Sequence, residues 1–137
     1  IRRLSRIYSM KLLLDTHTFL WFIGGNTNLS NTARNAIEDT SNQRFISIAT
    51  LWEISIKVSI RKLKIGIAFT ELVEQEVYGN AIEILEISSE HLDELVKLPF
   101  HHKDPFDRLI IAQSLVEDTT LLSKDAAFQS YPIKLLW

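Results

Sequence analysis

The chain has 137 residues, of which 46% are hydrophobic and 23% are charged, and its formal net charge is −2. This length predicts one globular domain that can bury a core without disulfides or a structural metal. Because there is no cysteine, disulfides, zinc–thiolate sites and a cysteine nucleophile are excluded, and we expect a cytoplasmic protein. The longest apolar runs are about a quarter of a bilayer span, so we expect no transmembrane helix.

The first nine residues differ in charge from the rest of the chain. They hold Arg2, Arg3 and Arg6, and the remainder carries 12 basic against 17 acidic residues, a net charge of −5. Met10 is the only methionine, and the hydrophobic pattern begins at the next residue. We therefore expect residues 1–9 to be a non-native or disordered extension and residues 10–137 to be a single domain. An acidic domain does not bind nucleic acid by bulk charge, so any such contact must be local.

Short apolar runs alternate with longer, helix-like ones along the chain, without internal repeats. In chain order, we expect strands over residues 11–14, 45–48, 82–87, 120–122 and 133–136. Between them we expect helices over residues 16–23 and 30–39, from Thr70 to Gly79, and from Ser88 or Ser89 to Pro99. Strands separated by helices predict right-handed crossovers and an α/β fold with a mainly parallel sheet.

Two later segments differ in how firmly their residues specify a structure. Asp104 fits an N-cap, Pro105 fits the first helical position, and Asp107 fits the third, so a helix begins there. From Trp52 to Ile60, in contrast, apolar and polar residues alternate strictly. This is the period of a half-buried strand, and periodicity alone predicts one.

Four of the seventeen carboxylates lie in apolar sequence surroundings: Asp15, Glu53, Asp107 and Asp125. Asp15 and Asp125 each follow a predicted strand, and ligands of parallel α/β sheets bind beyond the carboxyl ends of the strands. If Glu53 and Asp107 lie nearby, the acids repel one another unless a divalent cation binds. Oxygen ligands suit Mg²⁺ or Mn²⁺, and such a metal can activate water to hydrolyse a phosphate ester.

Each of these acids also has a purely structural interpretation. Asp15 and Asp125 can cap the helix or turn that follows, and Asp107 can stabilise the first turn of its helix. Glu53 can pair with Lys57, four residues later, if that segment is helical. Spacing alone leaves both interpretations open.

Four stretches of the chain resemble PIN domains, and specifically the VapC toxins of bacterial toxin–antitoxin pairs. They are KLLLDTHTFLW, FISIATLWEISIKVSIRKLKIG, LPFHHKDPFDRLIIAQS and TLLSKDAAFQSYPIKLLW. They occur in the expected order over nearly all of residues 10–137, and HHKDPFDRLIIAQ is the most specific of them. The resemblance implies a three-layer α/β/α sandwich around a mainly parallel sheet. It also implies a helix over about residues 49–62, against the alternation.

The resemblance further implies that Asp15, Glu53, Asp107 and Asp125 are the catalytic, metal-binding residues. Asp15, Asp107 and Asp125 would hold Mg²⁺, for which Mn²⁺ can substitute, while Glu53 would bind a second metal or orient the attacking water. Three further residues would support the site: Asp104 through a water, Ser123 by orienting a carboxylate or a water, and His17 by a first-turn hydrogen bond or an RNA contact.

Other side chains are assigned to substrate or partner binding. The basic residues expected to bind RNA are Lys57, Arg61, Lys62, Lys64 and Arg108. Arg108 has a second candidate role, which is to hold an acidic residue of an antitoxin. His101 and His102 are adjacent and point apart, so we expect no zinc site there. The aromatic residues expected in the core or in a dimer interface are Phe19, Trp21, Phe22 and Trp52.

Taken with the resemblance, these residues predict a Mg²⁺-dependent endoribonuclease toxin that is inhibited by a VapB-like antitoxin and forms a homodimer. Hydrolysis by water would leave 5′-phosphate and 3′-hydroxyl ends. The alternative is a non-catalytic PIN scaffold that binds RNA or a partner protein. A phosphatase of the haloacid dehalogenase type is disfavoured, because His17 stands where that family has a second aspartate. A receiver domain is disfavoured because no acidic residue precedes Asp15 at the first strand.

Overall fold

Three consecutive leucines form the centre of the fold. In the computed structural model, which describes residues 8–137, Leu12, Leu13 and Leu14 are fully buried in strand β1 (Lys11–Leu14). Leu12 and Leu14 pack into one hydrophobic cluster, and Leu13 packs into another on the opposite face. A strand buried on both faces belongs at the centre of a parallel sheet, because helices cover such a sheet on both sides.

Strand β1 is flanked by four other strands in a parallel sheet. These are β2 (Gln43–Ser47), β3 (Glu83–Leu85), β4 (Thr120–Leu122) and β5 (Lys134–Leu136), in the order β3-β2-β1-β4-β5. Every neighbouring pair is parallel, as the sequence predicted. The strand order changes direction between β1 and β4. In open α/β sheets, such a reversal creates a crevice at the carboxyl ends of the strands, where ligands bind.

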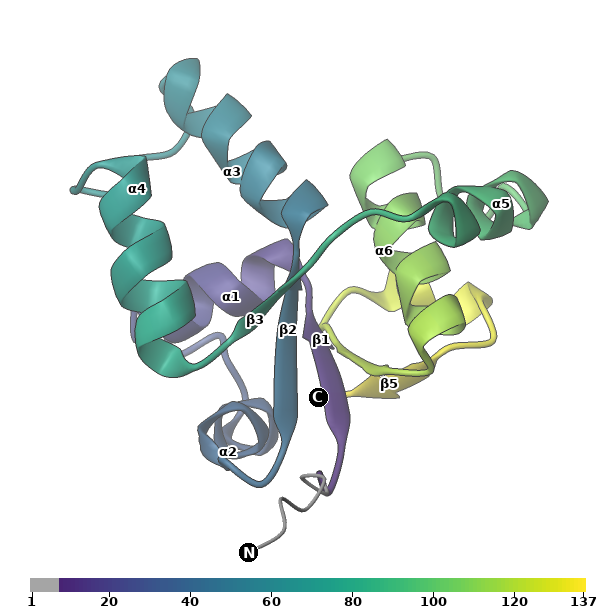
Figure 1. Ribbon diagram of the computed structural model, residues 1–137, viewed down its shortest axis with the longest axis horizontal. Helices are drawn as coiled ribbons and strands as arrows, with labels where there is room; N and C mark the ends of the chain where they lie inside the picture. Colours follow the sequence, from purple (N-terminus) through teal and green to yellow (C-terminus); the bar gives the residue numbers. More distant parts are fainter. Residues whose placement is uncertain (1–7) are drawn as a thin grey trace, which may run out of the picture.

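Helices cover both faces of this sheet and complete the predicted three-layer sandwich (Figure 1). One layer holds α1 (Thr16–Ile23), α2 (Asn31–Glu38), α3 (Ile48–Ser59) and α4 (Phe69–Leu72), which continues as η1 (Val73–Val77) and η2 (Tyr78–Asn80). The other holds α5 (Ser89–Lys97) and α6 (Pro105–Glu117), with η3 (Ala126–Ser130) beside them. Within residues 8–137, no helix has the length and apolar character needed to cross a bilayer.

The segment with alternating apolar residues is helix α3, as the family resemblance implied, and the strand favoured by periodicity is wrong. The Ser47 hydroxyl accepts a hydrogen bond from the Ala49 N–H at 3.0 Å and starts the helix. Among the five alternating apolar residues, Ile54 is fully buried, whereas Trp52 and Ile60 are 58% and 54% exposed. A half-buried strand would bury all five, so packing decides the structure here.

Most predicted helix limits are confirmed, and two are wrong. Asp104 caps α6 and accepts from the Asp107 N–H at 3.0 Å, with proline at the first helical position. Thr70 does not cap a helix, because α4 begins at Phe69 without a side-chain cap. That helical stretch also continues past Gly79 to a left-handed Ala81 with φ 55°.

Of the aromatic residues expected in the core or an interface, only one is mainly exposed. Phe19 is fully buried, and Trp21 and Phe22 are half-buried against the same core cluster. Trp52 is exposed and lies edge-on to Phe106, with ring centroids 5.2 Å apart. Of the N-terminal extension expected over residues 1–9, residues 1–7 lie outside the described residues. In the remaining part, the Ser9 N–H donates a hydrogen bond to the Ser41 carbonyl at 2.9 Å.

Two alanine substitutions in α3 test whether this segment packs as a helix. Ile54→Ala removes a fully buried side chain, and we expect it to lower the free energy of unfolding by about 2–5 kcal/mol. Ile60→Ala, at the exposed end of the helix, is the matched control and should change it by less than about 0.5 kcal/mol. Urea unfolding of both variants measures the difference, and equal losses would indicate a strand.

Candidate functional site

Two aspartates lie at the carboxyl ends of the two strands that border the crevice. Asp15 follows β1, is 5% exposed, and accepts a hydrogen bond through Oδ1 from the Thr18 N–H at 2.8 Å. Asp125 follows β4 by three residues and accepts through Oδ1 from the Ala127 N–H at 2.9 Å. The structural interpretation of both as capping residues is therefore right. Both also line one pocket of about 270 Å³, so they face the same space.

Asp107 lies in the first turn of α6, and its pKa is the most strongly shifted among the acids of the crevice. Burial, reinforced by the nearby Asp104 carboxylate, raises the pKa of Asp107 to about 6. Glu53 raises it further, whereas His102 lowers it by its charge and its hydrogen bond. The Asp107 Oδ2 atom lies 2.8 Å from the His102 Nε2 atom. The ionised form of Asp107 is thus disfavoured mainly by burial and, to a lesser extent, by the neighbouring negative charges.

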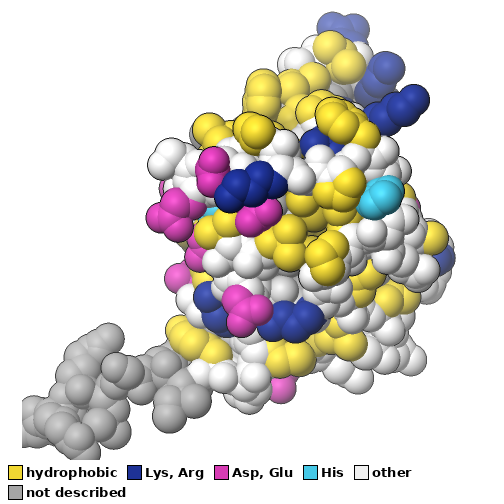
Figure 2. Space-filling view, turned by 90° about the vertical axis from the view of Figure 1, so that its right-hand side faces the viewer, with side chains coloured by type: hydrophobic (Ala, Val, Ile, Leu, Met, Phe, Trp, Pro, Cys, Tyr) yellow, Lys and Arg dark blue, Asp and Glu magenta, His cyan; other side chains and the backbone are white. Residues whose placement is uncertain are grey.

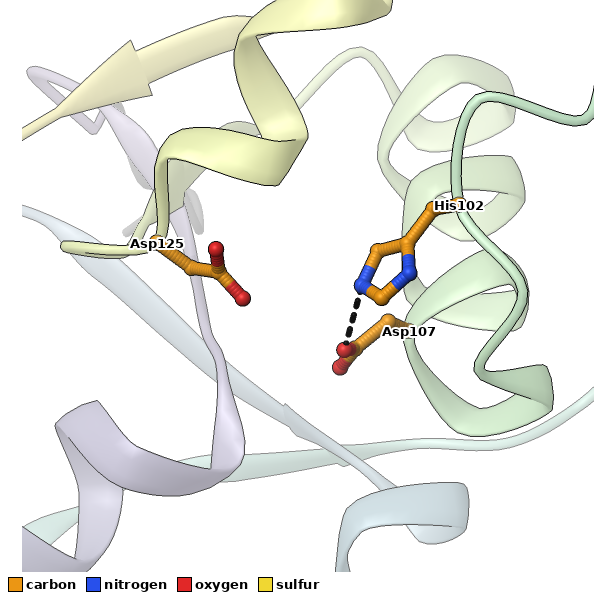
Figure 3. Close-up of side chains that lie close together, drawn as sticks. All are labelled: His102, Asp107 and Asp125. Carbon is orange, nitrogen blue, oxygen red and sulfur yellow. Dashed lines mark hydrogen bonds and ion pairs between the residues drawn. The ribbon is translucent and has the colours of Figure 1, made fainter.

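Within residues 8–137, three potential metal ligands from different segments come together (Figure 3). One ligand atom from each of His102, Asp107 and Asp125 lies within 4.8 Å of the others. Figure 3 shows the Asp125 carboxylate directed toward the His102–Asp107 pair from the opposite wall. Asp15 and Glu53 are not part of this tight group. Asp15 borders this group because it lines a pocket together with Asp125. Glu53 is near enough for its charge to raise the pKa of Asp107.

Glu53 is anchored to the carboxyl end of β1 as well as to its own helix. The Thr16 hydroxyl donates to Glu53 Oε1 at 2.7 Å, and Thr16 directly follows Asp15. Lys57 Nζ lies 3.1 Å from Glu53 Oε2, so the predicted pairing four residues apart is confirmed. Thr16 was not predicted from the sequence. Its position next to Asp15 was the only available signal.

The sequence also did not predict that His102 lies in the crevice. The segment that carries it is held from the other side, because the His102 N–H donates to the Tyr131 hydroxyl at 2.9 Å, and that hydroxyl donates to the Pro99 carbonyl at 2.7 Å. The ring of His101 packs edge-on against Tyr131, with centroids 5.2 Å apart. The two adjacent histidines therefore do point apart. The five-residue separation of His102 and Asp107 gives no periodic signal on a helix.

The expected contact of Arg108 with RNA or an antitoxin acid is corrected by the structure. Arg108 is only 7% exposed, and its guanidinium lies 4.0 Å from the centre of the Phe100 ring. Its N–H groups donate, at 3.0–3.4 Å, to the carbonyls of Leu95, Leu98, Pro99 and His102. Arg108 therefore stabilises the segment between α5 and α6, which includes His102, and is not an exposed binding group.

The other predicted basic residues lie at and beyond the end of α3. Lys57 is partly neutralised by Glu53, whereas Arg61, Lys62 and Lys64 are exposed. Arg61 adopts a left-handed conformation with φ 60°, which turns the chain after the helix. Arg61 and Lys64 line a second, larger pocket of about 790 Å³. Three exposed basic side chains therefore lie just beyond this end of α3.

The three predicted supporting residues all lie near the crevice. The Ser123 hydroxyl accepts from the Asp125 N–H at 3.0 Å, so it orients the turn that carries this aspartate. Asp104 caps α6 and adds negative charge near Asp107. His17 is exposed and stacks on Trp21, with ring centroids 5.5 Å apart.

The chemistry of these donors fits a divalent cation. Carboxylate oxygens from Asp15, Asp107 and Asp125 are hard ligands of the kind that Mg²⁺ and Mn²⁺ prefer. A cation between them would also favour the ionised form of Asp107, whose pKa is raised by burial and by the nearby Asp104 carboxylate. His102, which bonds to Asp107, corresponds to the hydrogen-bonding partners that orient ligating carboxylates in metal sites.

The fold is similar to those of known proteins. The family model described as PIN domain matches residues 12–134. The fold is similar to VapBC2 from Rickettsia felis bound to a promoter DNA fragment, with a TM-score of 0.70 and 20% identity, covering 93% of this chain and 98% of that one. It is also similar to a toxin–antitoxin complex from Klebsiella pneumoniae, with a TM-score of 0.62 and 19% identity over 92% and 96% of the two chains. A third similar structure is FitAcB from Neisseria gonorrhoeae, with a TM-score of 0.56 and 14% identity over 92% and 96%. No curated protein sequence matches this chain.

The raised pKa of Asp107 has a consequence for stability without metal. In EDTA, the folded protein binds this proton up to about pH 6, whereas an unfolded aspartate, with its ordinary pKa of 3.8, has already lost it. Ionisation at neutral pH therefore destabilises the fold. We expect Asp107→Asn to raise the melting temperature by a few degrees at pH 7, and the gain to disappear below about pH 4. Thermal melts of both proteins between pH 4 and 7.5 measure this. Asp118→Asn, on an exposed side chain, is the control, and a lower melting temperature for Asp107→Asn at pH 7 would contradict the expectation.

Proposed function

Because this chain belongs to the PIN domain family, we propose that it is an endoribonuclease toxin that requires Mg²⁺, with Mn²⁺ able to substitute. The observation that carries the proposal is the convergence of Asp107 and Asp125 with Asp15 at the crevice between β1 and β4. Separate segments of the chain supply these carboxylates. A purely structural network would not need to gather acids that repel one another.

In the proposed hydrolysis of a phosphodiester, the residues of the crevice have different roles. Asp15, Asp107 and Asp125 would hold the cation, which when bound activates water and stabilises the charge that develops on the phosphate. Glu53, fixed by the Thr16 hydroxyl, would orient the attacking water and accept its proton. His102 and Ser123 would position Asp107 and the turn of Asp125. Attack by water on phosphorus and cleavage of the bond to the 3′ oxygen leave a 5′-phosphate and a 3′-hydroxyl.

We also propose a cognate antitoxin and a homodimer as partners, in the cytoplasm. The solved complexes from Rickettsia felis and Klebsiella pneumoniae join toxins of similar fold to antitoxins, and this supports an antitoxin for this chain. The face in Figure 2 carries many hydrophobic side chains. On and after α5, Leu92, Val96 and Phe100 are 48%, 84% and 79% exposed. Exposed apolar patches of this kind mark protein interfaces and support the dimer.

A cleavage assay tests the proposed activity and its dependence on the crevice. With Mg²⁺, we expect the antitoxin-free protein to make discrete cuts in a mixed cellular RNA. Asp107→Asn should lower the rate at least about 100-fold, because it removes a charged ligand. The matched control is Asp118→Asn, which changes an 88% exposed aspartate outside the crevice.

The chemistry of the product ends and the effect of EDTA complete that assay. We expect 5′-phosphate ends and no cleavage in EDTA. Products with 2′,3′-cyclic phosphate would contradict hydrolysis by water. Intact RNA at every protein concentration, with the protein shown to be folded, would favour the non-catalytic scaffold instead.

The cations beyond α3 generate a second prediction, on affinity. Replacing Arg61, Lys62 and Lys64 together by alanine should weaken binding of single-stranded RNA in EDTA. It should also reduce the slope of log K against log salt concentration by about 2, because up to three phosphate contacts are lost. Fluorescence anisotropy over a salt series measures both. The control is the double variant Lys97→Ala, Lys134→Ala, whose lysines pair with Asp93 and Asp118, and an unchanged slope in the triple variant would refute the assignment.

A further inference from the structure

Beside the carboxylates lies a pocket with aromatic walls that the proposed hydrolysis does not use. Asp15, His17, Trp21, Lys124 and Asp125 line it. We propose that this pocket holds one unpaired RNA base next to the phosphate that is cleaved. This inference rests on the proposed function for its substrate, but it assigns a separate binding site with its own residues.

The size and position of the pocket suit a single base. Its volume of about 270 Å³ lies just below the roughly 300–1,000 Å³ of pockets that hold drug-sized ligands. Asp15 and Asp125 line this pocket, and Asp125 also belongs to the group of potential metal ligands with His102 and Asp107. A nucleotide whose phosphate lies at the carboxylates therefore has its base within reach of the aromatic walls.

The walls present flat rings in the orientation that stacking needs. His17 and Trp21 lie four residues apart on α1 and stack with an interplanar angle of 23° and centroids 5.5 Å apart. The rings of Trp137 and Trp21 pack in a T-shaped arrangement, with centroids 5.9 Å apart. His17 is exposed, so its ring can extend the stack by one further aromatic group. Unstacked RNA bases bind to proteins on such aromatic platforms.

Lys124 is the one positively charged side chain, beside two aspartates, among the described residues that line the pocket. Lys124 lies with its Nζ atom 5.9 Å from the centre of the Trp21 ring and lines the pocket together with Asp15 and Asp125. A cation in that place attracts the RNA backbone at a rim that is otherwise acidic.

Stacking by itself discriminates little among bases, but it is stronger for larger rings. We therefore expect a preference for purine over pyrimidine nucleotides. This preference should depend on the flat ring of His17 and not on hydrogen bonds from its nitrogens, because stacking does not involve the edges of the base.

Nucleotide binding without metal tests this inference separately from catalysis. The probes are the 5′-monophosphates AMP and UMP, and inorganic phosphate, titrated calorimetrically into the full chain in EDTA. We expect AMP to bind more tightly than UMP and phosphate. His17→Ala should weaken AMP binding about tenfold, whereas His17→Phe should keep it within about twofold of the parent, because it retains a ring. Lys124→Ala should weaken binding of both AMP and phosphate.

Both substituted residues are exposed, so the variants should fold, and Trp52→Ala is the control for an exposed aromatic side chain outside the pocket. Equal AMP affinity in the parent and in His17→Ala would overturn the inference. So would tighter binding of N-acetyl-arginine amide than of AMP, which would assign the pocket to a protein partner. If the parent cleaves RNA but its AMP affinity does not change in His17→Ala, the proposed function is supported and the base pocket is refuted. If His17→Ala weakens AMP binding but the parent cleaves no RNA, the nucleotide pocket is supported and the proposed function is refuted.

Discussion

Carboxylates that share a crevice repel one another, and the arrangement of this protein depends on how that repulsion is balanced. At Asp107, burial has the largest effect and the charge of Asp104 adds to it, and the pKa is raised to about 6. The neighbouring acids are each held by hydrogen bonds from the protein: Asp15, Asp125 and Glu53. These bonds fix the positions of the carboxylates without removing their charge. The crevice therefore stays negative enough to attract a divalent cation.

The capping and metal-binding interpretations of the aspartates are compatible. Asp15 and Asp125 each cap a helical turn through Oδ1, and a carboxylate has a second oxygen that accepts independently. A capping bond fixes the direction of the whole group, because both oxygens lie in one plane. The local sequence preference that starts a helix after each strand thus also orients a potential ligand at the crevice. The same holds for Asp104, whose cap places Asp107 on the first turn of α6.

The sequence could predict those elements whose limits depend on neighbouring residues. The start of α6 follows from Asp104 and the proline after it, and both are local. Helix α3 could not be predicted from its pattern, because exposure there depends on which side packs on the core, and only Ile54 of the alternating residues is fully buried. The four predicted acids come from conspicuous positions in the sequence. His102 could not be predicted, because its place depends on Tyr131, which is 29 residues away.

The strand order has a consequence for the time at which the crevice can form during synthesis. Asp15 and Asp125 are separated by 110 residues, and β4, which lies beside β1, follows almost all of the helices. A ribosome makes the chain from its N-terminus, and domains fold only when their contacts are available. Until β4 has left the exit tunnel, β1 has no neighbour on that side and the crevice has only one wall. Chains released from stalled ribosomes before β4 is made would therefore lack the carboxylate cluster, because Asp125 and one wall of the crevice would be missing.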